Sequence, residues 1–293
     1  MKKDLKLIYK INLKTMNKTK KTLLTFIFII FGIFIYLILQ TPSLDRNWAE
    51  DQKVLSEISF SWSNISIKNI RNFKYSSESE YESNYYDKDF NTDKIESVYY
   101  IIEPFSDYDW PAHTMLSFGF EDWSYLTVSA EIRKEVGESF WPIYWILNQY
   151  EMVYVIWDEN DLIKLRANYR KDDVFMYPIK TSKENIKQLF VSAMQRADKL
   201  SKKPEFYNTF TNTCITSILE HVNLLREDNW KEIISWSKKI FLPSHSDQIA
   251  YDLWLIDTEL SLKEAREYYK INDLSEKFWD DRNYSELIRK EKK

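Results

Sequence analysis

The 293-residue chain is 44% hydrophobic and 16% aromatic, so it has enough apolar surface for a core that needs neither a metal ion nor a disulfide. Its single cysteine excludes an intramolecular disulfide, and its three glycines exclude a glycine-rich phosphate loop or dinucleotide fingerprint. The first 22 residues hold eight lysines and one acid; setting these aside from the totals of 41 basic and 45 acidic residues leaves a net charge of −11. This acidity argues against nucleic acid as a partner, because phosphate binding depends on lysine and arginine.

The N-terminus predicts a membrane anchor. Leu23–Leu39 reads LLTFIFIIFGIFIYLIL and contains no charged residue, which is about 25 Å of helix and just enough to span a bilayer. Lysines precede this run and none follows closely, so the positive-inside rule makes residues 1–22 a cytoplasmic tail and places the chain from Thr41 onward outside. A cleaved signal peptide is the alternative, but residues 39–42 offer no small-x-small cleavage site. We therefore expect a single-pass protein with its N-terminus inside.

The first half of the external part predicts a β-sheet. A helix is expected at Asp45–Ser59, and the polar stretch Tyr75–Asn91 is expected to be a loop. Ile65–Ile70 alternates apolar and polar residues, which is typical of a strand. Further strands are predicted at residues 96–103, 114–120, 125–132, 150–158 and 173–178. The four residues Glu121–Ser124 are expected to close a hairpin.

From Lys183 onward the periodicity is helical. Ile215, Ile218, Leu219 and Val222 recur at i, i+3, i+4 and i+7, and further helices are predicted at residues 230–241 and 262–269. Strands followed by helices indicate an α+β domain. We expect residues 44–226 to form its main part and residues 227–293 to be a helical extension of the same domain.

Cys214 is a candidate nucleophile because of its place at the start of a predicted helix. Thr211 or Asn212 is a suitable N-cap, which puts Cys214 in the first turn. Unpaired backbone N–H groups and the helix dipole favour a thiolate there. The alternative is that Cys214, four residues before Ile218, simply packs on the apolar face.

His113 is the histidine best placed to act as a base for Cys214. It opens the predicted strand Thr114–Phe120, and the following strand brings back a carboxylate, Glu131, about as far from the turn. His113 and Glu131 are therefore predicted to be cross-strand neighbours, although a register shift of one residue would turn Glu131 to the opposite face. A thiolate, an imidazole and an orienting carboxylate together form a thiol site for acyl transfer.

The other two histidines are expected to be structural. His221 lies seven residues beyond Cys214 on the same helix, about 10 Å away by helical rise, and His245 lies in a polar loop. Three scattered histidines and one cysteine give no metal-ligand spacing, so neither a metal ion nor another cofactor is expected.

Five segments of the chain match one known domain family in motif and in order. They are Asn69–Phe73, Ala112–Phe120, Ser129–Glu138, Asn212–Thr216 and Ala250–Leu253. They resemble the Lnb N-terminal periplasmic domain family, and the resemblance extends across residues 44–290. That family is similar to the permuted papain-like group, which includes lecithin retinol acyltransferase-like enzymes and places the histidine strand before the cysteine helix.

The resemblance implies a fold, a catalytic pair and a reaction. The fold would be a permuted papain-like α+β domain, an antiparallel sheet packed against helices, with His113 and Cys214 as the catalytic pair. A branch of the family is linked to N-acylation of bacterial lipoproteins, in which an acyl chain moves from phospholipid to the amino group of the lipidated N-terminal cysteine. The chain is therefore expected to be a thiol acyltransferase at the outer face of the bacterial cytoplasmic membrane. Its acyl donor would be a membrane lipid and its candidate acceptor a lipoprotein.

Supporting residues complete the predicted site. Backbone N–H groups at the helix start, supported by Asn212 and Thr213, are expected to stabilise an oxyanion. Arg71 and Arg133 are candidates for contact with a phosphate head group, and the alternative for each is a surface or structural ion pair. Trp254 stands where a glycine is expected from the resemblance. The sequence gives no indication of the oligomeric state.

Two other functions stay open at the level of sequence. A cysteine amidase or peptidase of the cell envelope would use the same pair, with water as the acceptor. A non-catalytic envelope binding module would use Cys214 only for packing.

Overall fold

The computed structural model describes residues 17–105, 111–138, 150–208, 211–228, 232–234 and 243–290. The chain divides into two compact units, Met1–Thr41 and Pro42–Lys293. In the first unit, helix α1 runs from Lys18 to Leu39, and Asn17 caps it by accepting a hydrogen bond from the Lys20 N–H at 2.9 Å. The segment Lys18–Leu37 is long and apolar enough to cross a membrane, as predicted.

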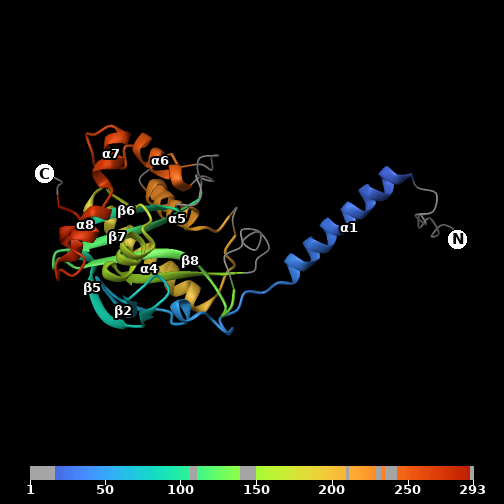
Figure 1. Cartoon of the computed structure of the whole chain (residues 1–293), viewed down its shortest axis with the longest axis horizontal. Coiled ribbons are helices and arrows are strands. Elements are labelled where there is room, and N and C mark those ends of the chain that lie inside the picture. Colours follow the sequence, from blue (N-terminus) through green and yellow to red (C-terminus); the bar gives the residue numbers. More distant parts are fainter. Residues whose placement is uncertain are drawn as a thin grey trace. The chain divides into compact units, whose positions relative to one another are not determined.

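The second unit is an α+β domain built on a mixed sheet (Figure 1). Among the described residues the strand order is β1-β2-β9-β8-β7-β6-β10, and β5 pairs with β2. The strands are β1 Glu57–Ser61, β2 Asn64–Arg71, β5 Tyr85–Asn91, β6 Ile95–Pro104, β7 Ala112–Phe120, β8 Tyr125–Arg133, β9 Glu151–Asp158 and β10 Phe175–Pro178. Neighbours are antiparallel except β2 and β9, which pair in parallel at Arg71 and Trp157. The expected α+β class is confirmed.

Two segments differ from the sequence-based expectation. Asp45–Ser59 is not a helix: it contains a short 3-10 turn, η1 (Glu50–Gln52), and leads into β1. Instead, its backbone forms hydrogen bonds with the segment after β8. The Ala49 N–H donates to the Lys134 carbonyl, and the Asn47 carbonyl accepts from the Val136 N–H. The second segment, residues 75–91, includes β5 and the short strands β3 (Lys74–Tyr75) and β4 (Tyr81–Glu82). Pairing with β2 makes β5 a strand despite its polar sequence.

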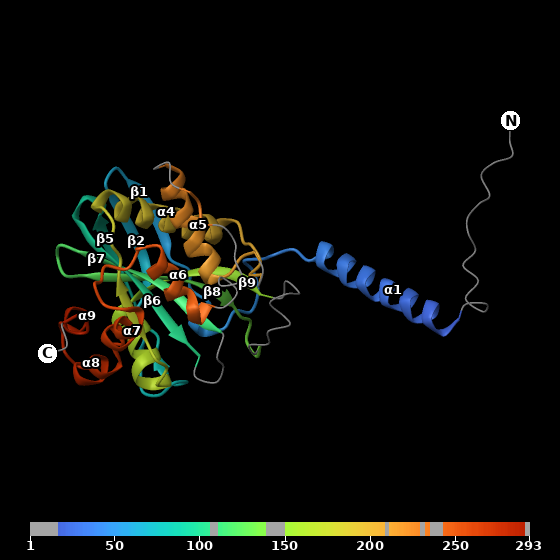
Figure 2. The same cartoon turned by 90° about the horizontal axis from the view of Figure 1, so that it is seen from above.

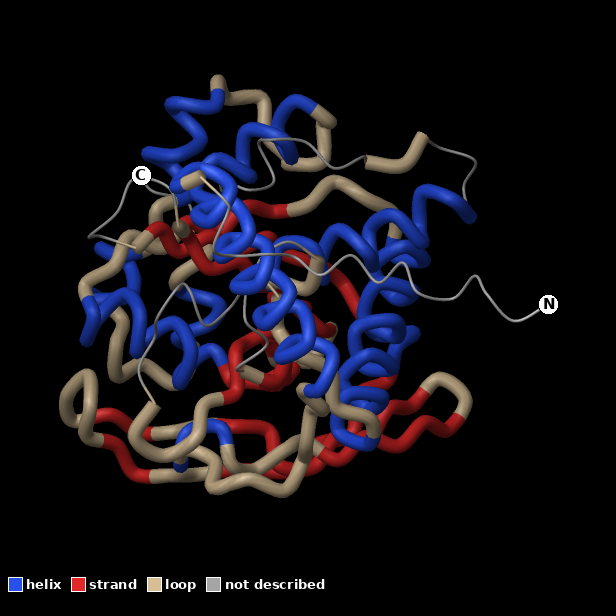
Figure 3. Tube along the Cα trace, turned by 90° about the vertical axis from the view of Figure 1, so that its right-hand side faces the viewer, coloured by secondary structure: helices blue, strands red, loops and turns tan. Residues whose placement is uncertain are grey.

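Helices pack on both faces of the sheet (Figures 2 and 3). On one face, α4 (Lys183–Lys202) lies beside α5 (Cys214–Asp228). Phe190 of α4 stacks edge-on against Phe118 and Phe120, which supplies much of this core. On the same side, η5 (Pro243–His245), α6 (Ser246–Asp252) and α7 (Leu262–Tyr269) adjoin β6 and β10. The prediction of a helix at residues 262–269 is confirmed, and the one at 230–241 lies mostly outside the described residues.

The opposite face is covered by short helical segments. They are α3 (Glu159–Lys164), the π-helical turn η3 (Leu165–Arg170), α8 (Asn272–Lys277) and α9 (Tyr284–Leu287). They bury a second apolar cluster that includes Met115, Leu162 and Tyr284. Because α8 and α9 come from the C-terminal extension and α3 and η3 from the middle of the chain, this face joins segments that are distant in sequence.

Three exposed tryptophans, Trp62, Trp123 and Trp254, have left-handed backbone conformations. Trp123 has φ of 60° in the turn Glu121–Ser124, which closes the β7–β8 hairpin as predicted. Trp254, which follows α6, has φ of 57° and is 84% exposed. This conformation costs a residue with a Cβ about 1 kcal/mol and costs glycine little. The left-handed backbone at position 254 therefore explains why the resemblance leads us to expect a glycine there.

Candidate active site

His113 and Glu131 lie where strands β7 and β8 separate. The β7–β8 ladder runs from Gly119 paired with Tyr125 to Met115 paired with Ser129 and ends there, although both strands continue. Continuing the register would set His113 opposite Glu131. Their side chains do meet, with His113 Nε2 2.9 Å from Glu131 Oε1 and 2.5 Å from Ser129 Oγ. The predicted cross-strand contact is confirmed.

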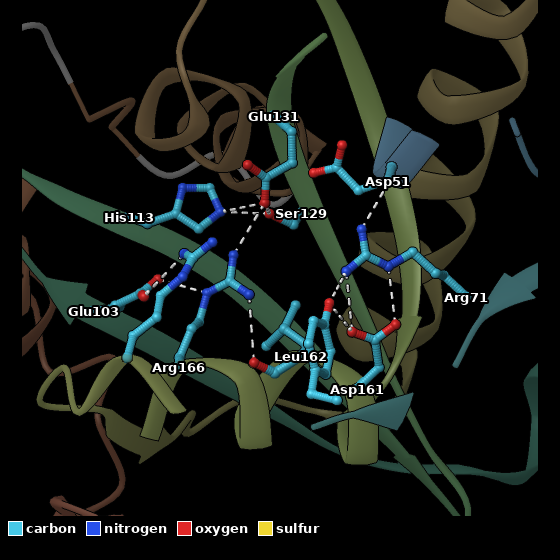
Figure 4. A network of polar contacts seen from close by, with 11 residues as sticks. Asp51, Arg71, Glu103, His113, Ser129, Glu131, Asp161, Leu162 and Arg166 are labelled. Atoms are coloured by element: carbon cyan, nitrogen blue, oxygen red, sulfur yellow. Dashed lines mark hydrogen bonds and ion pairs between the residues drawn. The ribbon is translucent and has the colours of Figure 1, made fainter. Parts of the chain in front are cut away.

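The Glu131 carboxylate is fixed by further polar contacts (Figure 4). Its Oε1 accepts a hydrogen bond from Ser129 Oγ at 2.6 Å and one from Arg166 Nη2 at 3.3 Å. Arg166 projects from η3 and donates through Nε to Glu103 Oε2 at 2.5 Å. Glu103 is the β6 residue paired with His113 in the β6–β7 ladder. These buried groups therefore connect both strands that flank His113 with the helical segment η3.

Ser129, Glu103 and Arg166 are site residues that the sequence analysis missed. Glu103 carried the clearest signal, since it is a carboxylate at the end of the apolar strand run VYYII. It is fully buried, and a buried carboxylate requires a partner. Arg166 lies in a segment without a recognisable motif, and Ser129 was not distinguished from its neighbours.

The electrostatics of the site favour an ion pair between His113 and Cys214. Burial lowers the pKa of His113, but the charge of Glu131 and hydrogen bonding with Cys214 raise it to about 10. Burial raises the pKa of the Cys214 thiol, but hydrogen bonding with His113 and the charge of that ring bring it below its ordinary value. Burial likewise raises the pKa of Glu131, and the charge of His113 outweighs this and holds it well below its usual range. The direction of each shift stabilises imidazolium, thiolate and carboxylate.

Cys214 is the first residue of α5, and its thiol is buried. The N-cap of α5 is Thr213, the residue directly before Cys214. The prediction that Thr211 or Asn212 caps the helix was wrong. The Thr216 N–H donates to Thr213 Oγ1 at 3.3 Å, and the Thr213 N–H donates to Thr216 Oγ1 at 2.7 Å. This reciprocal arrangement is a capping box with threonine in place of glutamate. It fixes Cys214 in the first turn of the helix, where an anion is favoured.

The loop before α5 brings a second group to the thiol. Asn212 supports this loop, since its Nδ2 donates to the Phe206 carbonyl at 2.8 Å. Tyr207, in the same loop, contacts both the side chain and the backbone of Cys214. Burial raises the pKa of Tyr207 well above its usual value, so its phenol stays protonated and can donate a hydrogen bond. Tyr207 was also missed, because no motif distinguishes it among 20 tyrosines.

The two arginines predicted to contact a head group are buried and have structural partners. Arg71 is 3% exposed, donates to the Asp161 carboxylate through Nε at 2.9 Å and Nη2 at 3.1 Å, and stacks over Trp157. Arg133 is 4% exposed and donates to the backbone carbonyls of residues 52–53. These contacts hold separate segments together. They give both residues a structural role, which the sequence analysis kept as the alternative to head-group binding.

The remaining histidines lie apart from the site. His221 is buried and hydrogen-bonds with Tyr154 and Ser192, and burial lowers its pKa to about 4. It joins α5 to α4 and β9 in its neutral form. His245 is exposed on η5. Within the described ranges, no group of three or more His, Cys, Asp or Glu side chains could hold a metal ion.

An α+β domain that follows one apolar N-terminal helix is consistent with a membrane-anchored protein. The profile of the Lnb N-terminal periplasmic domain matches residues 81–242, which is more than half of the chain. The chain therefore belongs to the Lnb N-terminal periplasmic domain family, as the resemblance predicted. The match includes three of the five segments and is shorter than the expected range of residues 44–290. No curated protein and no solved structure matches it. Family and anchor together are consistent with a periplasmic domain held at a membrane.

Proposed function

We propose that this protein is a thiol acyltransferase that moves an acyl chain from a membrane phospholipid to an amine, with the N-terminal amine of a lipoprotein as the candidate acceptor. One arrangement carries the proposal: Cys214 starts α5, the charge of the His113 ring lowers the pKa of its thiol, and Glu131 holds His113 Nε2. Because Nε2 contacts Glu131 and Ser129, Nδ1 is the ring nitrogen left to exchange a proton with the thiol. This is the nucleophile, base and orienting carboxylate of thiol catalysis.

The first step transfers the acyl chain to the enzyme. The Cys214 thiolate attacks the ester carbonyl of the phospholipid, and a carbon–sulfur bond forms. As the tetrahedral intermediate collapses, the ester carbon–oxygen bond breaks, and the His113 imidazolium gives its proton to the leaving oxygen. The products are an acyl thioester on Cys214 and a lysophospholipid. Glu131 stays ionised throughout and keeps the ring oriented.

The second step releases the acyl chain to the acceptor. A neutral amine attacks the thioester carbonyl, its proton passes to His113, and the carbon–sulfur bond breaks to restore the thiolate. In both steps negative charge develops on the carbonyl oxygen. In this proposal the Tyr207 phenol and the unpaired backbone N–H groups in the first turn of α5 are the donors that stabilise it. Asn212 contributes by holding the Tyr207 loop rather than by direct contact.

The location of the reaction follows from the anchor. Lysines fill the segment before α1, and the positive-inside rule places that segment in the cytoplasm. The domain would then face outward from the cytoplasmic membrane, on the side where lipoprotein amines and outer-leaflet phospholipids meet. The family's periplasmic assignment supports this orientation.

Product analysis tests the proposal. The full-length protein is incubated in detergent micelles with phospholipid and a diacylated lipopeptide that bears a free N-terminal amine. The proposal predicts N-acylated lipopeptide and lysophospholipid in equal amounts, and loss of both in Cys214→Ala and His113→Ala. Free fatty acid in place of the acylated peptide would show that water is the acceptor and that the enzyme is a hydrolase. Full formation of the product by Cys214→Ala would exclude thiol catalysis.

A further inference from the structure

A cavity of about 480 Å³ opens next to the candidate active site. Ile102 and Pro104 of β6 line it from the sheet. In the β6–β7 ladder Ile102 pairs with Thr114, and Pro104 pairs with Ala112, so both partners flank His113. Ile102 also belongs to the same apolar cluster as Cys214, on the face of the sheet covered by α5. The cavity is therefore one strand away from the reacting groups.

A guanidinium group held by a carboxylate also lines the cavity. Arg266 of α7 donates through Nε at 2.6 Å and Nη2 at 2.8 Å to the Asp247 carboxylate. Asp247 is almost completely buried and also accepts a hydrogen bond from the Tyr177 hydroxyl at 3.1 Å. The Arg266 side chain keeps 37% of its surface exposed. Asp247 thus holds the guanidinium in one orientation while part of it remains open to a ligand.

A second basic side chain also lines the cavity. Lys171 forms no ion pair within the described part of the chain. The other carboxylate that lines the cavity, Asp173, is paired with Lys270 at 2.5 Å. Both carboxylates therefore have basic partners, so the charged groups left for a ligand are Lys171 and the exposed part of Arg266.

We propose that this cavity binds the phosphate-bearing end of a glycerophospholipid. Arg266 and Lys171 contact the phosphate, and Ile102, Pro104 and Phe175 pack against the apolar part of the same molecule. The volume lies in the usual range for ligand sites, about 300–1,000 Å³. This inference rests on the proposed acyltransferase function, because a head group held here brings the ester of the donor lipid toward Cys214. Arg266 and Lys171 take the role that the sequence analysis gave to Arg71 and Arg133.

Equilibrium binding to the full-length protein in detergent micelles tests the inference. The protein carries Cys214→Ala, so that no acyl transfer occurs, and the probes are dioctanoyl phosphatidylglycerol, dioctanoylglycerol and inorganic phosphate. Lys171→Gln and Arg266→Gln are each expected to weaken binding of the phospholipid roughly tenfold, the usual effect of losing a hydrogen bond to a charged group. Lys263→Gln, an exposed position on the same helix as Arg266, is the control and should bind like the parent.

Three results would overturn the inference. Unchanged affinity in Lys171→Gln would do so without ambiguity, because that side chain has no ion-pair partner in the described residues whose loss could disturb the fold. Equal affinity for dioctanoylglycerol would show that the cavity does not recognise phosphate. Competition by inorganic phosphate as effective as by the lipid would make it a site for free anions.

The outcome can be separated from that of the proposed function. A wild-type chain that forms a thioester while Lys171→Gln and Arg266→Gln retain full lipid affinity would keep the acyltransferase and reject this cavity. If Lys171→Gln and Arg266→Gln weaken lipid binding but the wild-type chain never forms a thioester, the cavity is supported and the acyltransferase is rejected.

Discussion

Glu131→Gln isolates the electrostatic contribution of one carboxylate to the reactivity of Cys214. The substitution keeps the size of the side chain and an oxygen that can accept from Ser129 and Arg166, so the fold should persist. It removes a negative charge 2.9 Å from His113 Nε2. An opposite charge this close typically shifts a pKa by about 1–3 units.

The expected result concerns the pH at which Cys214 ionises. The pKa of His113 should fall from about 10 toward its ordinary value. Because a less basic ring is a weaker partner for the thiolate, the midpoint of thiol ionisation should rise by about one unit or more. In the wild type the thiolate therefore persists to lower pH than in the variant. At pH 7 the variant should lose roughly tenfold or more in the rate of thioester formation.

The measurement is the alkylation rate of Cys214 by iodoacetamide as a function of pH. The chain contains one cysteine, so incorporation reports on Cys214 alone. Glu135→Gln, which removes a partly exposed carboxylate paired with Arg46, is the matched control for loss of a negative charge. An identical midpoint for Glu131→Gln and the wild type would refute the idea that Glu131 stabilises the ion pair.

Three further predictions concern stability. Asp161→Asn leaves the buried Arg71 without its counter-charge and should lower the free energy of unfolding in urea by about 3–5 kcal/mol. The control is Lys68→Gln, an exposed position on the strand of Arg71, which should lower it by under about 0.5 kcal/mol. Equal losses in the two variants would contradict the structural role of the Arg71–Asp161 pair. Burial lowers the pKa of His221 to about 4, against about 6.5 in the unfolded chain, so the folded state favours neutral His221. The free energy of unfolding should therefore be constant above pH 6.5 and fall by up to roughly 3 kcal/mol as the pH drops toward 4. In His221→Gln the free energy of unfolding should depend less steeply on pH between 6.5 and 4. Thr213→Ala should cost about 1 kcal/mol by removing the cap, and Thr213→Ser should restore it; no difference between the two by thermal unfolding would count against the capping box.

Contacts that are local in sequence were predictable for physical reasons. The hairpin turn fixes where β7 and β8 face each other, so counting outward from it placed His113 against Glu131. Cys214 in the first turn of a helix followed from polar capping residues ahead of an apolar repeat. The exact cap was wrong because the string Thr-Asn-Thr offers three competing side chains, and the reciprocal bond from Thr216 decides for Thr213.

Contacts between distant segments were not predictable from local pattern. For Arg71 the sequence left head-group contact and an ion pair both open, because nothing near it in sequence reveals Asp161, 90 residues away. Arg166 reaches Glu131 from a π-helical turn, which has no distinctive residue pattern. The segment 45–59 was predicted to be a helix, but its backbone is satisfied by hydrogen bonds to residues 134 and 136. In each case a tertiary partner outweighs local preference.

The most direct test of acyl-thioester formation at Cys214 is the intact mass of the full-length protein after incubation with phospholipid in the absence of an acceptor. The proposed mechanism predicts an adduct of one acyl chain that hydroxylamine removes, that is absent from Cys214→Ala, and that is strongly reduced in His113→Ala. An unmodified wild-type mass, together with a Cys214 thiol that reacts with iodoacetamide only after unfolding, would contradict the mechanism. Cys214 would then be a residue of the core.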